Sequence, residues 1–477
     1  MSPSSARRNR IVVIVIVVGC LLLAALVDGS GSTSTSPAEQ LVALGPRLPV
    51  AHAAATAWYC AEGTSNPGGR ADERVMIANV DGFAARARVT VMQGPSQPAP
   101  SKTYDIAPRS LVVVRVADIL AVAEPGVLVE VTGGRSVVTH SVTGTGDAGY
   151  GPCARDTAAS WHFAAGTTVK GAQQDLALFN PFAEDAIVNI QFLTDTGPLG
   201  PEDLQGFVVP ARSRVTVPVQ DQARRHALVA TQVSTRRGRV VAEQSLVLDG
   251  TDGRKGLALS LGSPQLARHW EFANASVVPG RTQVMVIANP SSVPTSARVR
   301  TRLDGGALEP ETVSLPAGTA VSVDLGRRVP PGVGFSVAVE SRLPVVAESL
   351  VAVQAPIASV QRGIATTIGA TQWARRWVDA PARATATSQD LVAVLNPSGQ
   401  ALTFRMRVLT DGKTAVPPSA ERVRLEPGKR AVLDLVKLGA SPSATVVVEA
   451  TAPVVVERAS GAMPGITMAG AIPDLGS

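Results

Sequence analysis

An internal repeat constrains the fold of this chain more than any other feature of its sequence. A tryptophan recurs at intervals of 103 to 109 residues, and these tryptophans are Trp58, Trp161, Trp270 and Trp373. About twenty residues after each one, an apolar segment ends in asparagine, and these asparagines are Asn79, Asn180, Asn289 and Asn396. Self-similarity at a fixed period indicates one structural unit copied in tandem. The sequence therefore predicts four units, over residues 58–160, 161–269, 270–372 and 373–477.

The pattern inside each unit is typical of short strands. Proline follows the asparagine in the last three copies, and Asn-Pro is turn chemistry because asparagine can bond its own backbone while proline fixes φ. Beyond this turn apolar and polar residues alternate, which is the period of a half-buried strand. Valine and alanine dominate the apolar residues, and only 4% of the chain is aromatic, which favours strands over amphipathic helices.

The end of each unit carries two further valine-rich segments. We expect them to pair as a hairpin, Val337–Glu340 with Val345–Glu348 in the third copy and Val446–Glu449 with Val454–Glu457 in the fourth. About seven short strands per hundred residues then predict an all-β fold of tandem Ig-like antiparallel β-sandwich repeats. A propeller of small blades remains the alternative, because strand number alone does not fix closure.

The N-terminus predicts a membrane anchor. Arg7, Arg8 and Arg10 precede an uninterrupted apolar run from Ile11 to Val27, which as a helix would rise about 25 Å. The basic flank marks the cytoplasmic side, so we expect a tail over 1–10, a transmembrane signal anchor over 11–27 and a flexible tether over 28–57. A cleaved signal peptide and a lipoprotein box ending at Cys20 are the alternatives. The expected location is the plasma membrane, single-pass, with the C-terminal bulk extracytoplasmic.

The remaining two cysteines fit such a location. Cys60 and Cys153 lie at opposite ends of the first unit, and in an oxidising compartment this arrangement predicts a disulfide, with two free thiols as the alternative. A net charge of +6 over 477 residues is mild, so nucleic-acid binding is not expected.

Several motifs have the appearance of catalytic or binding sites, and the sequence argues against each. Asp195-Thr196-Gly197 spells an aspartic-protease triplet, but Asp304 and Asp411 occupy the same place in later copies and are followed by ordinary turn residues. Gly144–Gly149 has dinucleotide-loop spacing without a following helix pattern, and Asp249–Gly253 has too few spaced carboxylates for a calcium loop. No histidine pair has metal-ligand spacing. The sequence thus predicts no catalytic residue, no metal site and no cofactor.

The openings of the units carry a resemblance. Trp58–Gly63, Trp161–Gly166 and Trp270–Ala273 resemble the W-Y-F-A-E-G opening of a repeat in large secreted actinobacterial proteins of unknown function. The Pro-Ala-Arg-Ser at 210–213 and the Val-Ala-Glu before Gln244 and before Ser349 are similar to the same repeat. The fourth copy departs, because it opens with Trp373-Ala374-Arg375-Arg376-Trp377. The resemblance implies an extracytoplasmic β protein of a cell envelope, and it implies no catalytic residue.

These observations favour a non-catalytic, membrane-anchored structural or interaction protein of the envelope, whose partners are the membrane and an envelope polymer or protein. The alternative is a binding module for an anionic cell-wall polymer or lipid, and a hydrolase is a distant third. The candidate anion-binding residues share the polar face of the strand after the repeat asparagine, and they are Arg86, Arg88, Arg298, Arg300, Arg302, Arg405 and Arg407. Repeats stacked in one orientation would align them into a basic stripe.

Overall fold

The computed structural model describes residues 45–49, 55–66, 72–144, 147–353, 363–381, 389–461 and 466–475. Residues 45–477 form one compact unit, and every hydrophobic cluster of the described residues lies inside it. The expected tail, the apolar run over 11–27 and most of the tether lie outside the described residues. Within the described ranges, no helix is long and apolar enough to cross a membrane.

The first two repeats each fold into a sandwich of two antiparallel sheets. In the first repeat one sheet has the order β1 (Ala55–Cys60), β6 (Gly126–Gly133), β3 (Ala85–Met92), β4 (Ser101–Ile106), and the other has the order β5 (Leu111–Arg115), β2 (Asp72–Asn79), β7 (Ser136–Gly144), β8 (Asp147–Pro152). In the second repeat the corresponding sheets are β9 (Ser160–Phe163), β15 (Val229–Arg237), β11 (Ala186–Thr194), β12 (Pro198–Leu199) with β13 (Gln205–Val209) also on β11, and β14 (Ser213–Pro218), β10 (Ala172–Asn180), β16 (Val241–Asp249), β17 (Lys255–Leu261).

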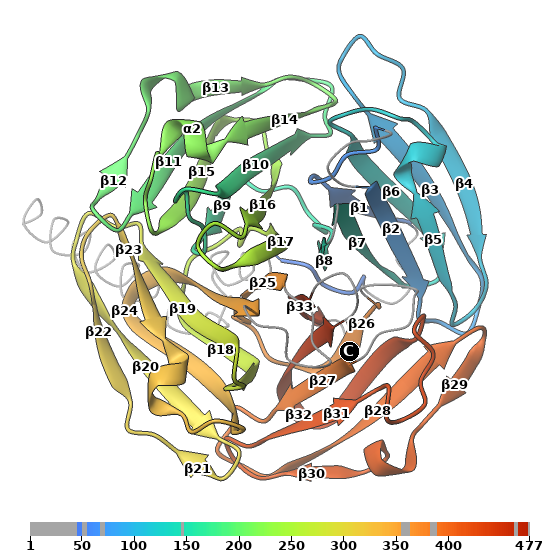
Figure 1. Cartoon of the computed structure of the whole chain (residues 1–477). Helices are drawn as coiled ribbons and strands as arrows, with labels where there is room; N and C mark the ends of the chain where they lie inside the picture. Colours follow the sequence, from blue (N-terminus) through green and yellow to red (C-terminus); the bar gives the residue numbers. More distant parts are fainter. Residues whose placement is uncertain are drawn as a thin grey trace, which may run out of the picture. The chain divides into compact units, whose positions relative to one another are not determined.

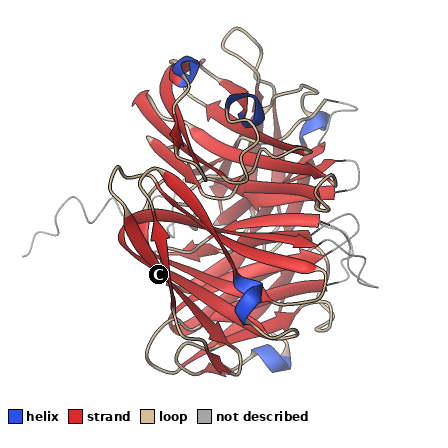
Figure 2. Cartoon of the chain, turned by 60° about the vertical axis from the view of Figure 1, so that its left-hand side comes forward, coloured by secondary structure: helices blue, strands red, loops and turns tan. Residues whose placement is uncertain are grey.

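In the last two repeats one long strand serves both sheets. The third repeat contains β18 (Ala267–Ser276), β19 (Arg281–Asn289), β20 (Thr295–Leu303), β21 (Gly306–Ala307), β22 (Glu311–Leu315), β23 (Thr319–Asp324), β24 (Gly334–Val353) and β25 (Gly363–Ile368). The fourth contains β26 (Ala374–Asp379), β27 (Gln389–Leu395), β28 (Leu402–Thr410), β29 (Lys413–Ala415), β30 (Val423–Leu425), β31 (Arg430–Asp434), β32 (Thr445–Gly461), β33 (Ile466–Gly470) and β34 (Ile472–Asp474). Helical turns are confined to short connections (Figure 2), namely η1 (Val116–Asp118), η2 (Glu202–Leu204), α2 (Val219–Gln222), η3 (Leu325–Arg328) and η4 (Pro418–Ala420).

The long strands correct the expected hairpins. Val337–Glu340 and Val345–Glu348 do not pair with each other, because both belong to β24. The first half of β24 pairs with β18 and β20, whereas the second half pairs with β19 and β25 in the other sheet. The strand β32 divides its pairing in the same way. The order is therefore not that of an immunoglobulin domain, in which the seventh strand joins the sheet of the sixth. Here β7 pairs with β2.

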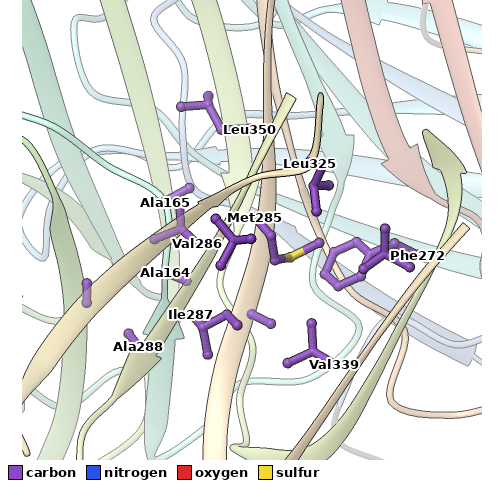
Figure 3. Close-up of a cluster of buried hydrophobic side chains, with 14 of the residues drawn as sticks. Ala164, Ala165, Phe272, Met285, Val286, Ile287, Ala288, Leu325, Val339 and Leu350 are labelled. Atoms are coloured by element: carbon purple, nitrogen blue, oxygen red, sulfur yellow. The ribbon is translucent and has the colours of Figure 1, made fainter. Parts of the chain in front are cut away.

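The four sandwiches close into a ring within the compact unit (Figure 1). The strands β8, β17, β25 and β33 contact one another in a closed cycle at its centre. Neighbouring sandwiches also share apolar clusters, as where Ala164 and Ala165 of the second repeat pack against Val286 and Ile287 of the third (Figure 3). The last interface is made the same way, because Val447 of the fourth repeat packs into the core of the first. The expected sandwiches are thus arranged as a closed ring instead of an open stack.

Part of the expected tether is ordered at this last interface. Leu48 is buried, and its backbone N–H donates to the carbonyl of Pro473 in β34 at 2.8 Å. Residues 55–57 begin β1. Residues 45–49 and 55–57 of the expected tether thus belong to the compact unit, and the rest of the tether lies outside the described residues.

The repeat tryptophans form equivalent core contacts, with one correction. Trp58, Trp161 and Trp270 are buried and face Val129, Val233 and Val339 of the adjacent strand, respectively. In the fourth repeat the equivalent pair is Trp377 with Val448, and Trp377 is 3% exposed. Trp373 is 39% exposed and lies edge-on to the ring of His269. The expected role of Trp373 therefore belongs to Trp377, four residues further along.

The four repeat asparagines have one shared structural role. Each is buried, and its side-chain amide donates to the carbonyl four residues later, which belongs to Phe83, Glu184, Val293 or Gln400, at 2.7–2.9 Å. Each amide also bonds a carbonyl at the end of a strand in the opposite sheet, such as Val209 at 3.1 Å for Asn180. The asparagine therefore fixes the turn after its strand and joins the two sheets.

Candidate functional site

Each repeat buries one polar pair at the same place in its fold. The first member lies six residues before the repeat asparagine, the second lies diagonally across on the adjacent strand, and such diagonal neighbours are within reach of long side chains. The pairs are Glu73 with His140 (3.3 Å), Gln174 with Gln244 (2.9 Å), Gln283 with Ser349 (3.0 Å) and Asp390 with Arg458 (2.6 Å). The chemistry of the pair differs in every copy, although its position does not.

A buried carboxylate from one repeat binds the opening segment of the preceding repeat. Oε2 of Glu243 accepts the backbone N–H groups of Ala61 and Glu62 at 3.1 and 2.6 Å. Glu348 and Glu457 stand at the same ladder position as Glu243. We refer to the contacts of Glu243, Glu348 and Glu457 as the carboxylate clamps. They explain why Val-Ala-Glu recurs at the end of the second and third units and Val-Val-Glu stands at the same place in the fourth.

The other two clamps have the same form. Oε2 of Glu348 accepts the N–H groups of Ala164 and Ala165 at 3.1 and 2.9 Å. Oε2 of Glu457 accepts the N–H of Asn274 at 2.7 Å. Each clamp therefore satisfies backbone donors of the segment after the repeat tryptophan, which would otherwise be buried without partners.

The interface between the fourth and first repeats is built differently. Thr139 occupies the clamp position in the first repeat. The hydroxyl of Tyr150 instead donates to the carbonyl of Ala380 at 2.8 Å and lies 3.3 Å from Oδ1 of Asp379. The carboxylate at this interface thus comes from the opening segment itself, and burial raises the pKa of Asp379 to about 7 against the opposing effect of Arg458.

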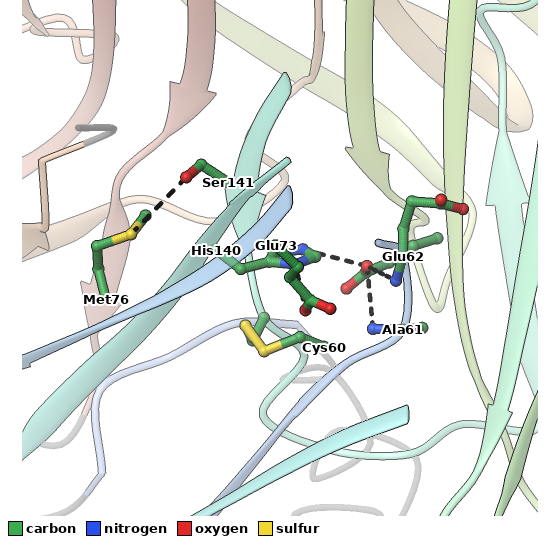
Figure 4. Close-up of a disulfide and its surroundings, with 9 residues drawn as sticks. Cys60, Ala61, Glu62, Glu73, Met76, His140 and Ser141 are labelled. Carbon is green, nitrogen blue, oxygen red and sulfur yellow. Dashed lines mark hydrogen bonds and ion pairs between the residues drawn. A yellow bond between two sulfur atoms is a disulfide. The ribbon is translucent and has the colours of Figure 1, made fainter. Parts of the chain in front are cut away.

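The interface between the first and second repeats gathers additional titratable groups (Figure 4). His140 is fully buried; its Nδ1 lies 3.3 Å from Oε1 of Glu73 and its Nε2 lies 3.1 Å from Oε2 of Glu243. On the other side of the clamp, the guanidinium of Arg214 contacts Oε1 of Glu62 at 3.2 Å and donates to the carbonyl of Gly63 at 3.0 Å. These five side chains form a buried polar cluster that the clamps of Glu348 and Glu457 do not have.

The electrostatics of this cluster follow from its burial. Burial raises the pKa of Glu62 to about 7 even though Arg214 acts in the opposite direction. Burial also raises the pKa of Glu73, opposed by its bond to His140. Burial alone would lower the pKa of His140, but Glu243 and Glu73 outweigh it and raise that pKa. His140 therefore lies between two carboxyl groups, one from each repeat, and both favour its charged form.

The predicted disulfide is confirmed and lies beside this cluster. Cys60 and Cys153 are bonded, with Cα atoms 4.7 Å apart. In the second repeat the equivalent positions hold Phe163 and Gly262, and a Cβ on Gly262 would lie 2.7 Å from Cζ of Phe163. The disulfide therefore replaces the packing of an aromatic ring on a glycine.

Three residues of types that can bind a metal also lie close together here. The ligand atoms of Cys60, Cys153 and His140 all lie within 4.8 Å of one another. The two sulfur atoms are bonded to each other, however, and both ring nitrogens of His140 face carboxylates. The arrangement is that of a disulfide beside an imidazole whose two nitrogens contact carboxyl groups.

The structure does not bring the candidate anion-binding arginines into one stripe. They lie on β3, β20 and β28, in three different sandwiches of the ring (Figure 1). Five of the seven contact a carboxylate: Arg86 with Asp105, Arg300 with Glu340, Arg302 with Glu271, and both Arg405 and Arg407 with Glu449. Arg88 donates to the hydroxyl of Ser101 at 3.2 Å, and Arg298 is exposed. Most of these candidate arginines are therefore members of ion pairs.

The other chemical motifs occupy turns. Asp195–Gly197 connects β11 to β12, and Oδ1 of Asp195 lies 3.1 Å from Nδ1 of His226 on the surface. In the Asp249–Gly253 turn, Asp249 bonds the N–H of Thr251, while the Asp252 carboxylate pairs with Arg254. Of the Gly144–Gly149 segment, residues 145 and 146 lie outside the described residues.

One known protein family matches part of the chain. A family of unknown function (DUF5719) matches residues 129–258, a span that runs from β6 into β17 and includes His140, Arg214 and Glu243. No curated protein matches the sequence. The region 129–258 is thus similar to an uncharacterised family.

Three solved structures show limited likeness. The crystal structure of Thermotoga maritima 1070 is 18% identical, with 22% of this chain and 95% of that chain covered and a TM-score of 0.21. The Anabaena sensory rhodopsin transducer is 17% identical, with 17% and 92% covered and a TM-score of 0.16. A tetra-tandem repeat from the extending region of a large adhesion protein is 9% identical, with 83% and 98% covered and a TM-score of 0.11. At these TM-scores the likeness supports no functional transfer.

Proposed function

We propose that this chain is a non-catalytic, membrane-anchored extracytoplasmic protein that serves as a structural or interaction component of a cell envelope. The observation that carries the proposal is the use of its recurring polar side chains. Glu243, Glu348 and Glu457 all bind backbone groups of a neighbouring repeat and are buried. The repeated chemistry of this protein therefore joins the four sandwiches at three of the four interfaces of the ring.

Two further features support an extracytoplasmic location. The Cys60–Cys153 disulfide is of a kind that persists in oxidising compartments. The basic residues before the apolar run over 11–27 favour an anchor whose following chain lies outside.

The two alternatives receive less support from the site. His140 and Glu73 are fully buried, so this titratable cluster is not exposed to a hydrolase substrate. Carboxylates pair with five of the seven candidate arginines, so those rows offer few free guanidinium groups to an anionic polymer.

The proposal is tested in intact, wall-stripped cells that carry the full chain. Added protease should digest the region 58–477 and leave a short N-terminal fragment, because the anchor protects it. In-cell crosslinking followed by mass spectrometry should recover envelope components as partners. Complete protection of the region 58–477 from protease would contradict the location, and crosslinks to cytoplasmic proteins alone would contradict the envelope role.

A further inference from the structure

The turn after the repeat asparagine presents an exposed apolar side chain in three of the four copies. Phe83 is 58% exposed, Phe182 is 44% exposed and Val293 is 55% exposed. The asparagine amide holds these turns in place, as where Asn79 donates to the carbonyl of Phe83 at 2.8 Å. A large apolar side chain kept in water on a fixed turn adds no burial to the fold, and such residues mark interaction sites when they are grouped.

A second turn faces the turn after the repeat asparagine. In all four copies this second turn contains one residue whose φ lies in the left-handed region. This residue is Gly318 in the third repeat and Gly428 in the fourth, with φ of 66° and 68°. In the first and second repeats it is Arg109 and Arg212, both with φ of 51°. A side chain costs about 1 kcal/mol in this conformation, whereas glycine adopts it freely. Stability alone therefore favours glycine at the two positions where the chain has arginine.

The exposed phenylalanine and the strained arginine are neighbours. The N–H of Arg212 donates to the carbonyl of Phe182 at 2.9 Å, and the N–H of Arg109 donates to the carbonyl of Asp81 at 3.1 Å. The Arg109 guanidinium also lies over the turn, because a Cβ on Gly82 would be 2.9 Å from its Nη2. Within the described residues, neither guanidinium has a carboxylate partner, in contrast to Arg86 or Arg300.

We propose that Phe83, Arg109, Phe182 and Arg212, the Phe–Arg surface, bind an anionic lipid bilayer. The phenylalanines enter the boundary between headgroups and acyl chains, while the arginines pair with lipid phosphates. The inference rests on the proposed envelope function and names the surface through which the ring contacts the membrane. Each site is small, but two sites on one rigid ring bind together, which raises the overall affinity.

The place where the chain enters the compact unit favours a membrane over a soluble partner. Leu48 is bonded to Pro473, and the neighbouring Asp474 contacts Arg135 at 3.2 Å. Arg135 in turn pairs with Asp81 at 3.1 Å, two residues before Phe83. The residues that follow the predicted anchor are thus joined through two ion pairs to the turn that carries Phe83. The first and second repeats, which carry the two sites, are adjacent copies in the ring.

The test uses residues 45–477, since this compact unit contains all the described hydrophobic clusters and lacks the apolar run that would itself enter lipid. The probes are vesicles of pure phosphatidylcholine and vesicles that contain phosphatidylglycerol. The wild-type unit should cosediment with the phosphatidylglycerol vesicles, and binding should fall by at least tenfold as salt is raised.

Two double variants separate binding from folding. R109G/R212G should lose at least tenfold in binding while the Tm stays the same or rises, because glycine suits both turns. F83S/F182S should lose binding at unchanged Tm, because both side chains are exposed. The matched control V208S/R375Q removes an exposed valine and an exposed arginine elsewhere on the ring and should bind as wild type.

Equal binding of wild type to both kinds of vesicle would overturn the proposal, as would R109G/R212G binding at wild-type strength. Inorganic phosphate that displaces the protein at constant ionic strength would instead assign these residues to free phosphate. Failure of vesicle binding leaves the protease result on intact cells unaffected, so the two proposals fail separately.

Discussion

Replacing Glu348 with alanine tests the carboxylate clamps most directly. Glu348 is fully buried; Oε2 accepts two backbone N–H groups of the second repeat and Oε1 accepts the hydroxyl of Ser260 at 2.6 Å. The alanine variant leaves three buried donors without an acceptor. An unsatisfied buried donor costs about 1–3 kcal/mol, and neighbouring losses are not additive, so we expect a loss of about 3–6 kcal/mol in the free energy of unfolding.

Two further variants provide the comparison for Glu348→Ala. Glu348→Gln keeps one oxygen for the backbone donors and an amide that can donate to Ser260, so it should lose only about 1 kcal/mol. Glu340→Ala, in the same strand, removes a half-exposed ion pair with Arg300 and should also cost about 1 kcal/mol or less. The order of the three variants is the informative result.

The assay combines urea unfolding with hydrogen exchange of the peptide that covers residues 161–166. Exchange at Ala164 and Ala165 should rise sharply in Glu348→Ala and hardly in Glu340→Ala, because only Glu348 binds these amides. Unchanged exchange in Glu348→Ala, or a stability equal to that of Glu340→Ala, would refute the idea that the clamps hold the repeats together.

Three further outcomes are expected. Thiol labelling of the unfolded, unreduced chain should find neither Cys60 nor Cys153, and Cys60→Ser/Cys153→Ser should destabilise by about 4–5 kcal/mol in chemical denaturation, because the disulfide closes a loop of 93 residues; labelling of both would contradict this. Burial raises the pKa of Glu457 from 4.5 to about 7, so the stability linked to this group is present below pH 4.5 and lost as the pH rises through 7; Glu457→Gln should remove about 3 kcal/mol of that pH dependence in denaturation curves from pH 4.5 to 8.5, and parallel curves for both proteins would show the reasoning to be wrong. Trp377→Ala should cost about 3–5 kcal/mol by thermal unfolding, whereas Trp373→Ala should cost under about 1 kcal/mol, and the reverse order would contradict the assignment of the fourth repeat.

Local chemistry made the strands, the turns and the disulfide predictable. Asn180 and its counterparts are followed by turn residues in each copy, and Cys60 and Cys153 were the two cysteines left to pair. The exchange of Trp373 for Trp377 has a similarly local cause. The fourth unit opens with two tryptophans, four residues apart. The regular spacing of the repeat favoured Trp373, whereas only Trp377 faces Val448 on the adjacent strand.

The ring and the buried cluster depend on information that the sequence does not display. The backbone N–H partners of Glu348 are 184 and 183 residues away, and backbone donors carry no residue signature. His140 has no histidine or cysteine at metal spacing in the sequence, and its partners Glu73 and Glu243 come from two repeats. The expected hairpin in β24 failed because two valine-rich segments can continue from one sheet to the next as readily as they fold back.

The closed cycle of β8, β17, β25 and β33 makes the copy number a property of the fold. An open array of repeats can lengthen by duplication, because a new copy stacks on its neighbour and a capping copy covers the end. Here every copy already has a neighbour on both sides, so a fifth would have no vacant face to occupy. Divergence in such a molecule is therefore expected in the loops and in the chemistry of individual interfaces, while the count of four is preserved.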